Sequence, residues 1–184
     1  AYTFYATVGA IATTGAKPIL VDINDDYNIN PKEIVKKITK KTKAIVPVHW
    51  SGRPCDMDTL EKISMDFKIP VIEDACHALQ AEYFGKRCGS FGNAGCFSFH
   101  PLKNLNVWGD GGIVTTNDED LKNKLKLIRN HGLINRDVCQ EFAYNSRLDT
   151  IQAVVAKYLI KNKLENITSK SCLLYTSPSP RDSS

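Results

Sequence analysis

The chain has 184 residues, 42% of them hydrophobic and 24% charged, which is ordinary for a soluble protein that buries a single core. Its net charge of +4 comes from lysines spread along the chain, with no stripe of arginines and aromatic residues, so a nucleic-acid partner is not expected. No apolar run approaches the length of a membrane span and the first residues show no signal-peptide pattern, so no membrane partner is expected either.

Helices and strands alternate along the chain, judged by hydrophobic period and by turn residues. The expected helices cover about residues 5–14, 31–37, 58–67, 118–130 and 149–162. The expected strands cover residues 17–21, 43–48, 70–74, 95–99 and 112–116. Helix starts are supported by Asn30 before Pro31 and by a capping box formed by Asp58 and Glu61. This order predicts an α/β fold, a three-layer sandwich with helices on both faces of a mainly parallel central sheet.

The cysteines show neither a C-x-x-C pair nor a Cys/His spacing typical of zinc. They are Cys55, Cys76, Cys88, Cys96, Cys139 and Cys172. Several lie in apolar runs, so we expect reduced, mostly buried thiols, a cytoplasmic protein and no metal site.

Two polar residues follow predicted strands. Asp74 ends the strand 70–74, and Lys103 lies in a turn between the strand 95–99 and the glycines of 109–112. Because the carboxyl ends of parallel strands meet at one edge of a sheet, we expect Asp74 and Lys103 to lie close together. Pyridoxal phosphate requires a lysine amine that can form a Schiff base and a carboxylate that keeps the ring nitrogen protonated. Taken alone, Lys103 is typical of a solvated surface and Asp74 of a helix N-cap.

The sequence around these residues resembles the DegT/StrS-type family of nucleotide-sugar aminotransferases. The two stretches are Val71-Ile-Glu-Asp-Ala-Cys-His77 and Ser98-Phe-His-Pro-Leu-Lys-Asn-Leu-Asn-Val-Trp-Gly-Asp-Gly-Gly112, and the order of motifs agrees from about residue 1 to 164. The resemblance implies a fragment of the large domain of a fold-type I enzyme that uses pyridoxal 5'-phosphate. It also implies that Lys103 forms the Schiff base and moves a proton between the sugar and the cofactor. Asp74 then pairs with the pyridinium nitrogen.

The resemblance assigns four more residues to the cofactor, and each has an alternative. His77 would lie near the phenolic oxygen, or make an ordinary hydrogen bond at a helix start. Ser98 would bind the phosphate, or bond its own strand backbone. Phe4 would stack on the ring, or pack in the core. Asn145 would contact the phosphate in a neighbouring subunit's site, or be a turn residue before the last helix.

The proposed part of Asn145 implies a homodimer with two shared sites. Residues 49–54 match a family loop beside the cofactor. Trp50 stands in this loop where other members often carry a different residue, which leaves the substrate contacts there open.

Both ends of the chain indicate a partial gene product. Residue 1 is alanine, and the family's glycine- and threonine-containing phosphate loop would precede it. We expect residues 1–165 to be a partial cofactor-binding large domain that lacks the small C-terminal domain. Residues 166–184 are expected to be a helix end and a Ser/Pro-rich tail that resembles translated sequencing adaptor, the alternative being a disordered linker.

These observations predict transfer of an amino group from glutamate to a nucleotide-linked keto-deoxysugar, with the ketone at C3 or C4, in aminosugar and polysaccharide biosynthesis. A sugar dehydratase of the same family is one alternative, but it carries histidine in place of Lys103. A nucleotide-binding module would explain the alternation of elements, although the G-x-G-x-x-G turn is missing. An inactive remnant or a regulator that senses a small ligand is a further alternative.

Overall fold

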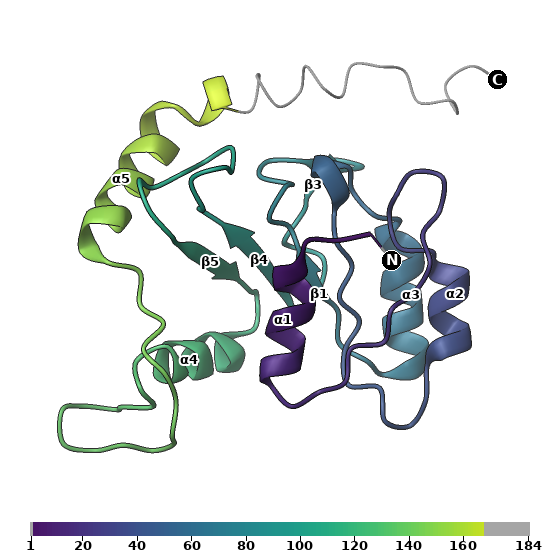
Figure 1. Ribbon diagram of the computed structural model, residues 1–184, viewed down its shortest axis with the longest axis horizontal. Coiled ribbons are helices and arrows are strands. Elements are labelled where there is room, and N and C mark those ends of the chain that lie inside the picture. The colour runs from purple at the N-terminus through teal and green to yellow at the C-terminus, as the bar shows by residue number, and fades with distance from the viewer. Residues whose placement is uncertain (1, 168–184) are drawn as a thin grey trace.

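The computed structural model describes residues 2–167 as an α/β fold (Figure 1). Cys172 and the tail expected to be non-native lie outside the described residues. The elements are α1 (Tyr5–Thr13), α2 (Pro31–Lys37), the 3-10 turn η1 (Trp50–Gly52), α3 (Met57–Phe67), β1 (Ile72–Asp74), β2 (Glu82–Tyr83), β3 (Lys86–Arg87), β4 (Ala94–Ser98), β5 (Gly112–Thr115), α4 (Glu119–Ile128) and α5 (Thr150–Asn162). Within residues 2–167, no helix is both long and apolar enough to cross a membrane.

The central sheet is mainly parallel, as predicted, with one antiparallel strand pair that makes it mixed. Its order is β1-β4-β5, with β1 parallel to β4 and β4 antiparallel to β5. Residues 45–48 extend it beside β1, through parallel bridges from Ile45 to Val71 and from Val48 to Asp74. The strand β5 runs backward because residues 99–111 contain no helix to carry the crossover that a parallel strand needs.

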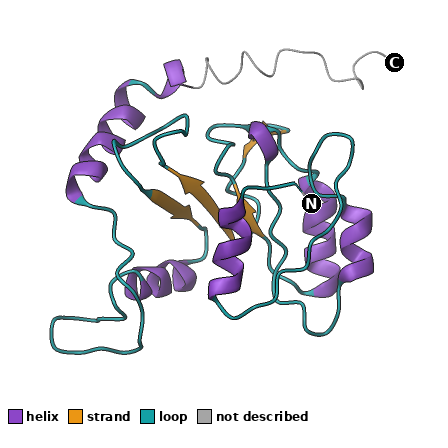
Figure 2. Cartoon of the chain, viewed as in Figure 1, coloured by secondary structure: helices purple, strands orange, loops and turns teal. Residues whose placement is uncertain are grey.

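Helices lie to either side of the strands (Figure 2). The helices α2 and α3 stand beside each other beyond β1, whereas α4 and α5 lie beyond β5. Their capping residues explain where they begin. The Asn30 side chain accepts a hydrogen bond from Lys32 N–H at the start of α2. The start of α3 differs from the prediction, because the N-cap is Asp56 and not Asp58.

Two further features of the strands differ from the prediction. Residues 17–21 form no strand within the described part of the chain, and Ile19 and Leu20 are 56% and 60% exposed. The hairpin β2–β3 was not foreseen. Its two-residue turn, Phe84 and Gly85, has positive φ at both positions, which is typical of a type I′ turn.

Two core clusters hold the sheet in place. The first packs α2 and α3 against the strands through Ile34, Ile45, Cys55, Met57, Leu60, Ile63, Ile69 and Val71. The second joins Leu105 and Val107 of the lysine loop to Val155 on α5. Each such side chain contributes about 1.5–3 kcal/mol by its burial, so the loop that carries Lys103 is firmly anchored.

The described cysteines are free thiols, as expected. Cys55 and Cys88 are buried, Cys76 and Cys96 are partly buried, and Cys139 is exposed.

Candidate active site

Asp74 lies at the carboxyl end of β1 with both carboxylate oxygens engaged. The Thr7 hydroxyl on α1 donates to Oδ2 at 2.7 Å, and the Cys76 backbone N–H donates to Oδ1 at 3.2 Å. Thr7 is itself hydrogen-bonded to Thr3 at 2.8 Å. The sheet end and the first helix therefore fix the orientation of this carboxylate together.

Lys103 follows the carboxyl end of the neighbouring strand. The chain turns tightly after β4: the His100 N–H donates to Ser98 Oγ at 3.2 Å, and the Lys103 N–H donates to the His100 carbonyl at 2.8 Å. Because β1 and β4 are parallel, Asp74 and Ser98 lie at the same edge of the sheet. This is the edge at which the sequence predicted the site.

The charges of Lys103 and Asp74 converge on His77. Burial lowers the pKa of His77, and the positive charge of Lys103 lowers it further, against the opposing effect of Asp74. The same two residues act on Cys76, whose pKa is raised to about 12 by burial and then by Asp74, with Lys103 opposing. The structure therefore brings Lys103 and Asp74 near His77, and the roles of these residues at a cofactor stay predictions.

An aromatic wall formed by Tyr2, Trp50 and His77 borders this cluster. The Trp50 ring meets the His77 ring at 5.3 Å between centroids and the Tyr2 ring at 4.4 Å, both edge to face. The side chain of the buried Asn28 holds Trp50 in place, because its Oδ1 accepts a hydrogen bond from the Trp50 backbone N–H at 3.0 Å. His77 Nδ1 is buried and has no hydrogen-bond partner among the described residues.

The alternative to a cofactor role is excluded for Phe4, whereas for Ser98 the alternative contact is present. Phe4 is the N-cap residue of α1 and is 66% exposed, so plain core packing is wrong for it. Ser98 makes the local backbone bond that was its alternative, through His100 N–H. The cofactor contacts of both residues stay predictions.

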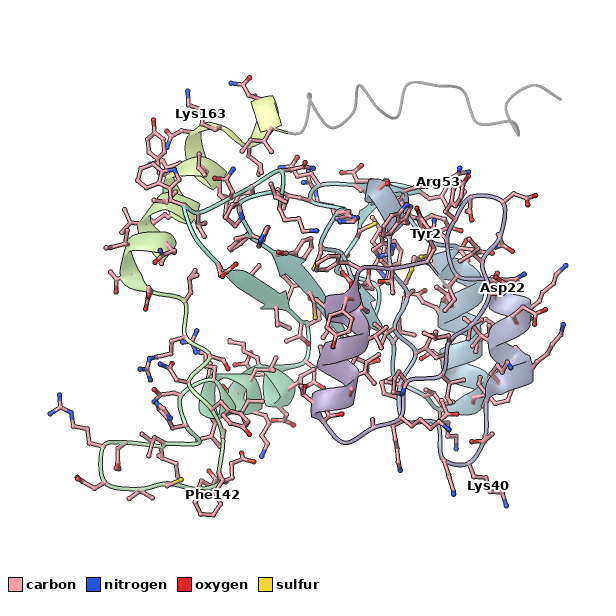
Figure 3. The ribbon with its side chains drawn as sticks, in the orientation of Figure 1. Tyr2, Asp22, Lys40, Arg53, Phe142 and Lys163 are labelled. Carbon is pink, nitrogen blue, oxygen red and sulfur yellow. The ribbon has the colours of Figure 1, made fainter. Side chains whose placement is uncertain are left out.

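Asn145 lies apart from the cluster. It pairs with Asn130 at the end of α4, and its side chain accepts the Arg147 N–H at 3.2 Å. The segment between α4 and α5 projects from the rest of the chain, with Phe142 on it (Figures 1 and 3). Within one chain Asn145 is not brought to Asp74 and Lys103, and its role in a partner's site stays a prediction.

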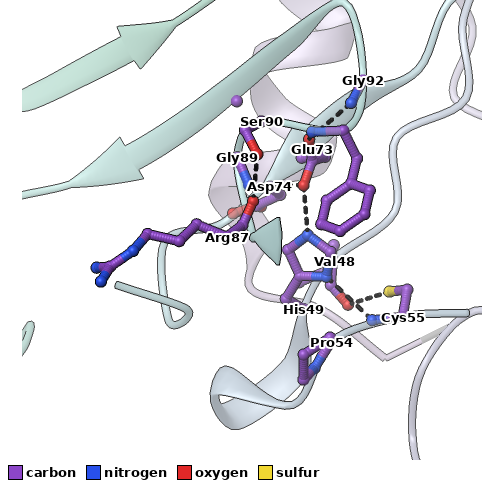
Figure 4. A network of polar contacts seen from close by, with 12 residues as sticks. Val48, His49, Pro54, Cys55, Glu73, Asp74, Arg87, Gly89, Ser90 and Gly92 are labelled. Atoms are coloured by element: carbon purple, nitrogen blue, oxygen red, sulfur yellow. Dashed lines mark hydrogen bonds and ion pairs between the residues drawn. The ribbon is translucent and has the colours of Figure 1, made fainter. Parts of the chain in front are cut away.

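Sequence reasoning missed two features of the site. One is Thr7, which lies 67 positions from the carboxylate that it contacts. The other is a buried network beneath β1, centred on His49 and Glu73 (Figure 4). Its sequence signal is a glutamate in an otherwise apolar strand, a residue type that is almost never fully buried without a partner.

The fold and the cluster define an α/β protein with a lysine and a carboxylate gathered at the carboxyl edge of parallel strands. The model of the DegT/DnrJ/EryC1/StrS aminotransferase family matches residues 1–172, and the chain belongs to this family. The family and the fold class predicted from the sequence are therefore confirmed.

Two relatives with curated descriptions show what the chain is similar to. The chain is 46% identical over 156 residues to a "Pleiotropic regulatory protein" of Geobacillus stearothermophilus, covering 84% of this chain and 42% of that protein. It is 44% identical over 157 residues to the UDP-N-acetyl-3-dehydro-alpha-D-glucosamine 3-aminotransferase of Acidithiobacillus ferrooxidans, covering 85% and 42%. The chain thus spans less than half the length of these relatives.

A solved structure shows the same fold with a cofactor. The structure of NtdA from Bacillus subtilis, with bound cofactor PMP, matches with a TM-score of 0.78 and 34% identity. The match covers 92% of this chain and 37% of that one. PMP is the aminated form of pyridoxal phosphate, so this neighbour agrees with the cofactor type that the sequence predicted.

Proposed function

We propose that the complete gene product carrying this chain is a pyridoxal-phosphate-dependent aminotransferase of nucleotide-linked keto-sugars. The observation that carries the proposal is the placement of Asp74 and the Lys103 turn at the shared carboxyl edge of the parallel strands β1 and β4. The family match and the PMP-bound neighbour support the cofactor.

The residues present fit pyridoxal phosphate. Two donors fix the orientation of the Asp74 carboxylate, as the partner of a pyridinium nitrogen would require. His77 Nδ1 is a buried polar atom without a hydrogen-bond partner in the described part of the chain. Ser98 would bind the phosphate and Phe4 would cover the ring.

Lys103 has two tasks in this proposal. Its Nζ would hold the cofactor covalently, and the released amine would take a proton from one carbon and return it to another. When bound, pyridoxal phosphate would supply an electron sink for this proton transfer. Asp74 would keep the ring nitrogen protonated.

The substrate is proposed to be a nucleotide-linked sugar with a ketone at C3, and the amino donor L-glutamate. The 3-aminotransferase name of the Acidithiobacillus relative supports the position of the ketone. We propose aminosugar and polysaccharide biosynthesis in the cytoplasm as the setting. The related dehydratase is disfavoured by Lys103, because a lysine stands where that enzyme has histidine.

Turnover and covalent labelling test the proposal. The complete gene product is incubated with L-glutamate and UDP-linked 3-keto and 4-keto sugars, and the aminosugar is measured by mass spectrometry. Lys103→Ala is expected to reduce turnover by at least about 10³-fold, since it removes the amine proposed to form the Schiff base and to move the proton. Borohydride should attach the cofactor to Lys103 in the unmodified protein. Labelling of a different lysine contradicts the assignment, and amination of the 4-keto sugar alone contradicts the C3 proposal.

We also propose a homodimer in which Asn145 completes the partner's site. The exposure of Phe142 (103%) and Tyr144 (86%) on the projecting segment supports a surface that another subunit covers. Mixing Lys103→Ala with Asn145→Ala subunits should restore activity, because a hybrid dimer contains one intact site. Mixtures no more active than the separate variants contradict shared sites.

A further inference from the structure

A fully buried carboxylate lies beneath the candidate site. Glu73 immediately precedes Asp74 on β1, is 0% exposed, and points to the opposite face of the strand. Its Oε2 accepts hydrogen bonds from His49 Nε2 at 3.0 Å and from Gly89 N–H at 2.6 Å. Its Oε1 accepts from Phe91 N–H and Gly92 N–H, both at 2.7 Å. Figure 4 shows this network.

The network fixes the state of both side chains. The Cys55 backbone N–H donates to His49 Nδ1 at 3.1 Å, so Nδ1 carries no proton and Nε2 is the donor to Glu73. The imidazole is therefore neutral and the carboxylate is ionised. Burial alone would raise the pKa of Glu73, but the bonds from His49, Gly92 and Gly89 outweigh it and the pKa is lowered.

His49 holds two consecutive residues of β1. Its side chain binds the Glu73 carboxylate, and its own backbone N–H donates to the Asp74 carbonyl at 3.1 Å. The His49 carbonyl then accepts the Gly52 N–H at 3.1 Å, closing the turn η1. A Cβ at Gly52 would lie 2.8 Å from the His77 carbonyl, so this turn packs directly on the backbone of His77. His49 thus connects the backbone of Asp74, through the turn η1, to the backbone of His77.

We propose that His49 and Glu73 form a positioning pair, which sets Asp74 and His77 in the geometry that the cofactor requires. The pair touches neither the cofactor nor the substrate, and it acts through the backbone of β1 and η1. This inference rests on the proposed function, because the residues that it positions are those assigned to the cofactor. It goes beyond that function by giving two buried residues outside the cluster a role in cofactor binding.

Two substitutions at residue 49 separate the link to Glu73 from simple packing. In His49→Gln the amide reaches the position of Nε2 and can still donate to Glu73, but the Cys55 N–H loses its acceptor. In His49→Asn the amide reaches only the position of Nδ1, which keeps Cys55 and loses Glu73. A third variant, Glu73→Gln, replaces a carboxylate that accepts from four donors by an amide. The amide NH₂ then faces backbone or imidazole N–H groups that have lost their acceptor. The matched control is Asn93→Ala, which removes the acceptor of Val71 N–H at the far end of β1.

The readouts are the dissociation constant and visible spectrum of pyridoxal phosphate in the complete gene product, together with Tm. We expect His49→Asn and Glu73→Gln to bind the cofactor at least about tenfold more weakly, the loss typical of a hydrogen bond to a charged group. His49→Gln should stay within about threefold of the unmodified protein. Asn93→Ala should lower Tm without changing the dissociation constant. Nitrogen NMR of the cofactor-free protein should show His49 protonated at Nε2.

The possible failures are distinguishable. If the unmodified protein shows no visible cofactor spectrum, the proposed function is overturned and this inference with it. If it binds the cofactor but His49→Asn and Glu73→Gln bind equally well, the inference alone is overturned. Protonation of His49 at Nδ1 also contradicts the proposed pair. So does a loss of cofactor affinity in His49→Gln that is as large as the loss in His49→Asn.

Discussion

At the scale of single residues, the carboxylate of Asp74 depends on a hydroxyl donor from a distant helix. The Thr7 side chain donates to Asp74 Oδ2 at 2.7 Å, and a hydrogen bond to a charged group is worth about 1.5–3 kcal/mol. Thr7→Val keeps the shape and removes the donor, so we expect cofactor binding to weaken by about tenfold. Thr7→Ser keeps the hydroxyl and should bind nearly as well as the unmodified protein. Titration of cofactor absorbance checks this, and equal affinity for Val and Ser would show that the donor is unimportant.

The same scale shows which site residues a sequence can reveal. Asp74 and Lys103 could be found because each follows a recognisable strand, and strand ends gather at one edge of the sheet. Thr7 and His49 could not, since their partners are 67 and 24 positions away and nothing local marks the contact. Glu73 carried only a weak signal, a charged residue within an apolar strand.

At the scale of elements, the N-cap of α3 distinguishes the structure from the sequence prediction. The Asp56 side chain accepts from Thr59 N–H at 3.2 Å and from the Thr59 hydroxyl at 2.8 Å. Asp56→Ala should therefore lower the free energy of unfolding by about 1 kcal/mol. Asp58→Ala, at the position that the capping box had favoured, loses a charge in the first turn and a long hydrogen bond from the Tyr83 hydroxyl (3.5 Å), and should cost less. Urea unfolding of the two variants decides between them, and a larger loss for Asp58 would restore the predicted start.

The helices were easier to predict than the strands. Hydrophobic period and caps placed all five helices to within a few residues, because these signals are local. The direction of β5 depends on the route of residues 99–111, and the absence of a helix there was a signal for an antiparallel return. The hairpin β2–β3 was hidden because its turn begins with Phe84 at φ 47°, where Asn or Gly is usual.

At the scale of the whole molecule, the buried thiols should make the free energy of unfolding decrease at alkaline pH. Burial raises the pKa of Cys88 from 9.0 to about 12, and it raises that of Cys55 as well. In the unfolded chain these thiols ionise near pH 9, while in the folded protein they stay protonated, so the folded state binds more protons. Their contribution is complete below pH 9 and is lost as the pH rises above it.

Each of these two thiols should remove about 1.4 kcal/mol of stability per pH unit above pH 9, until its folded-state pKa is reached. Urea unfolding between pH 8 and pH 10 under reducing conditions measures the slope. Cys88→Ala should reduce that slope by the contribution of one thiol, about 1.4 kcal/mol per pH unit. It should also lower stability at pH 8, because it leaves a small cavity. Cys139→Ala is the control, because Cys139 is exposed and its removal should leave the slope unchanged. A slope that Cys88→Ala does not alter would mean that this thiol does not remain protonated in the folded protein.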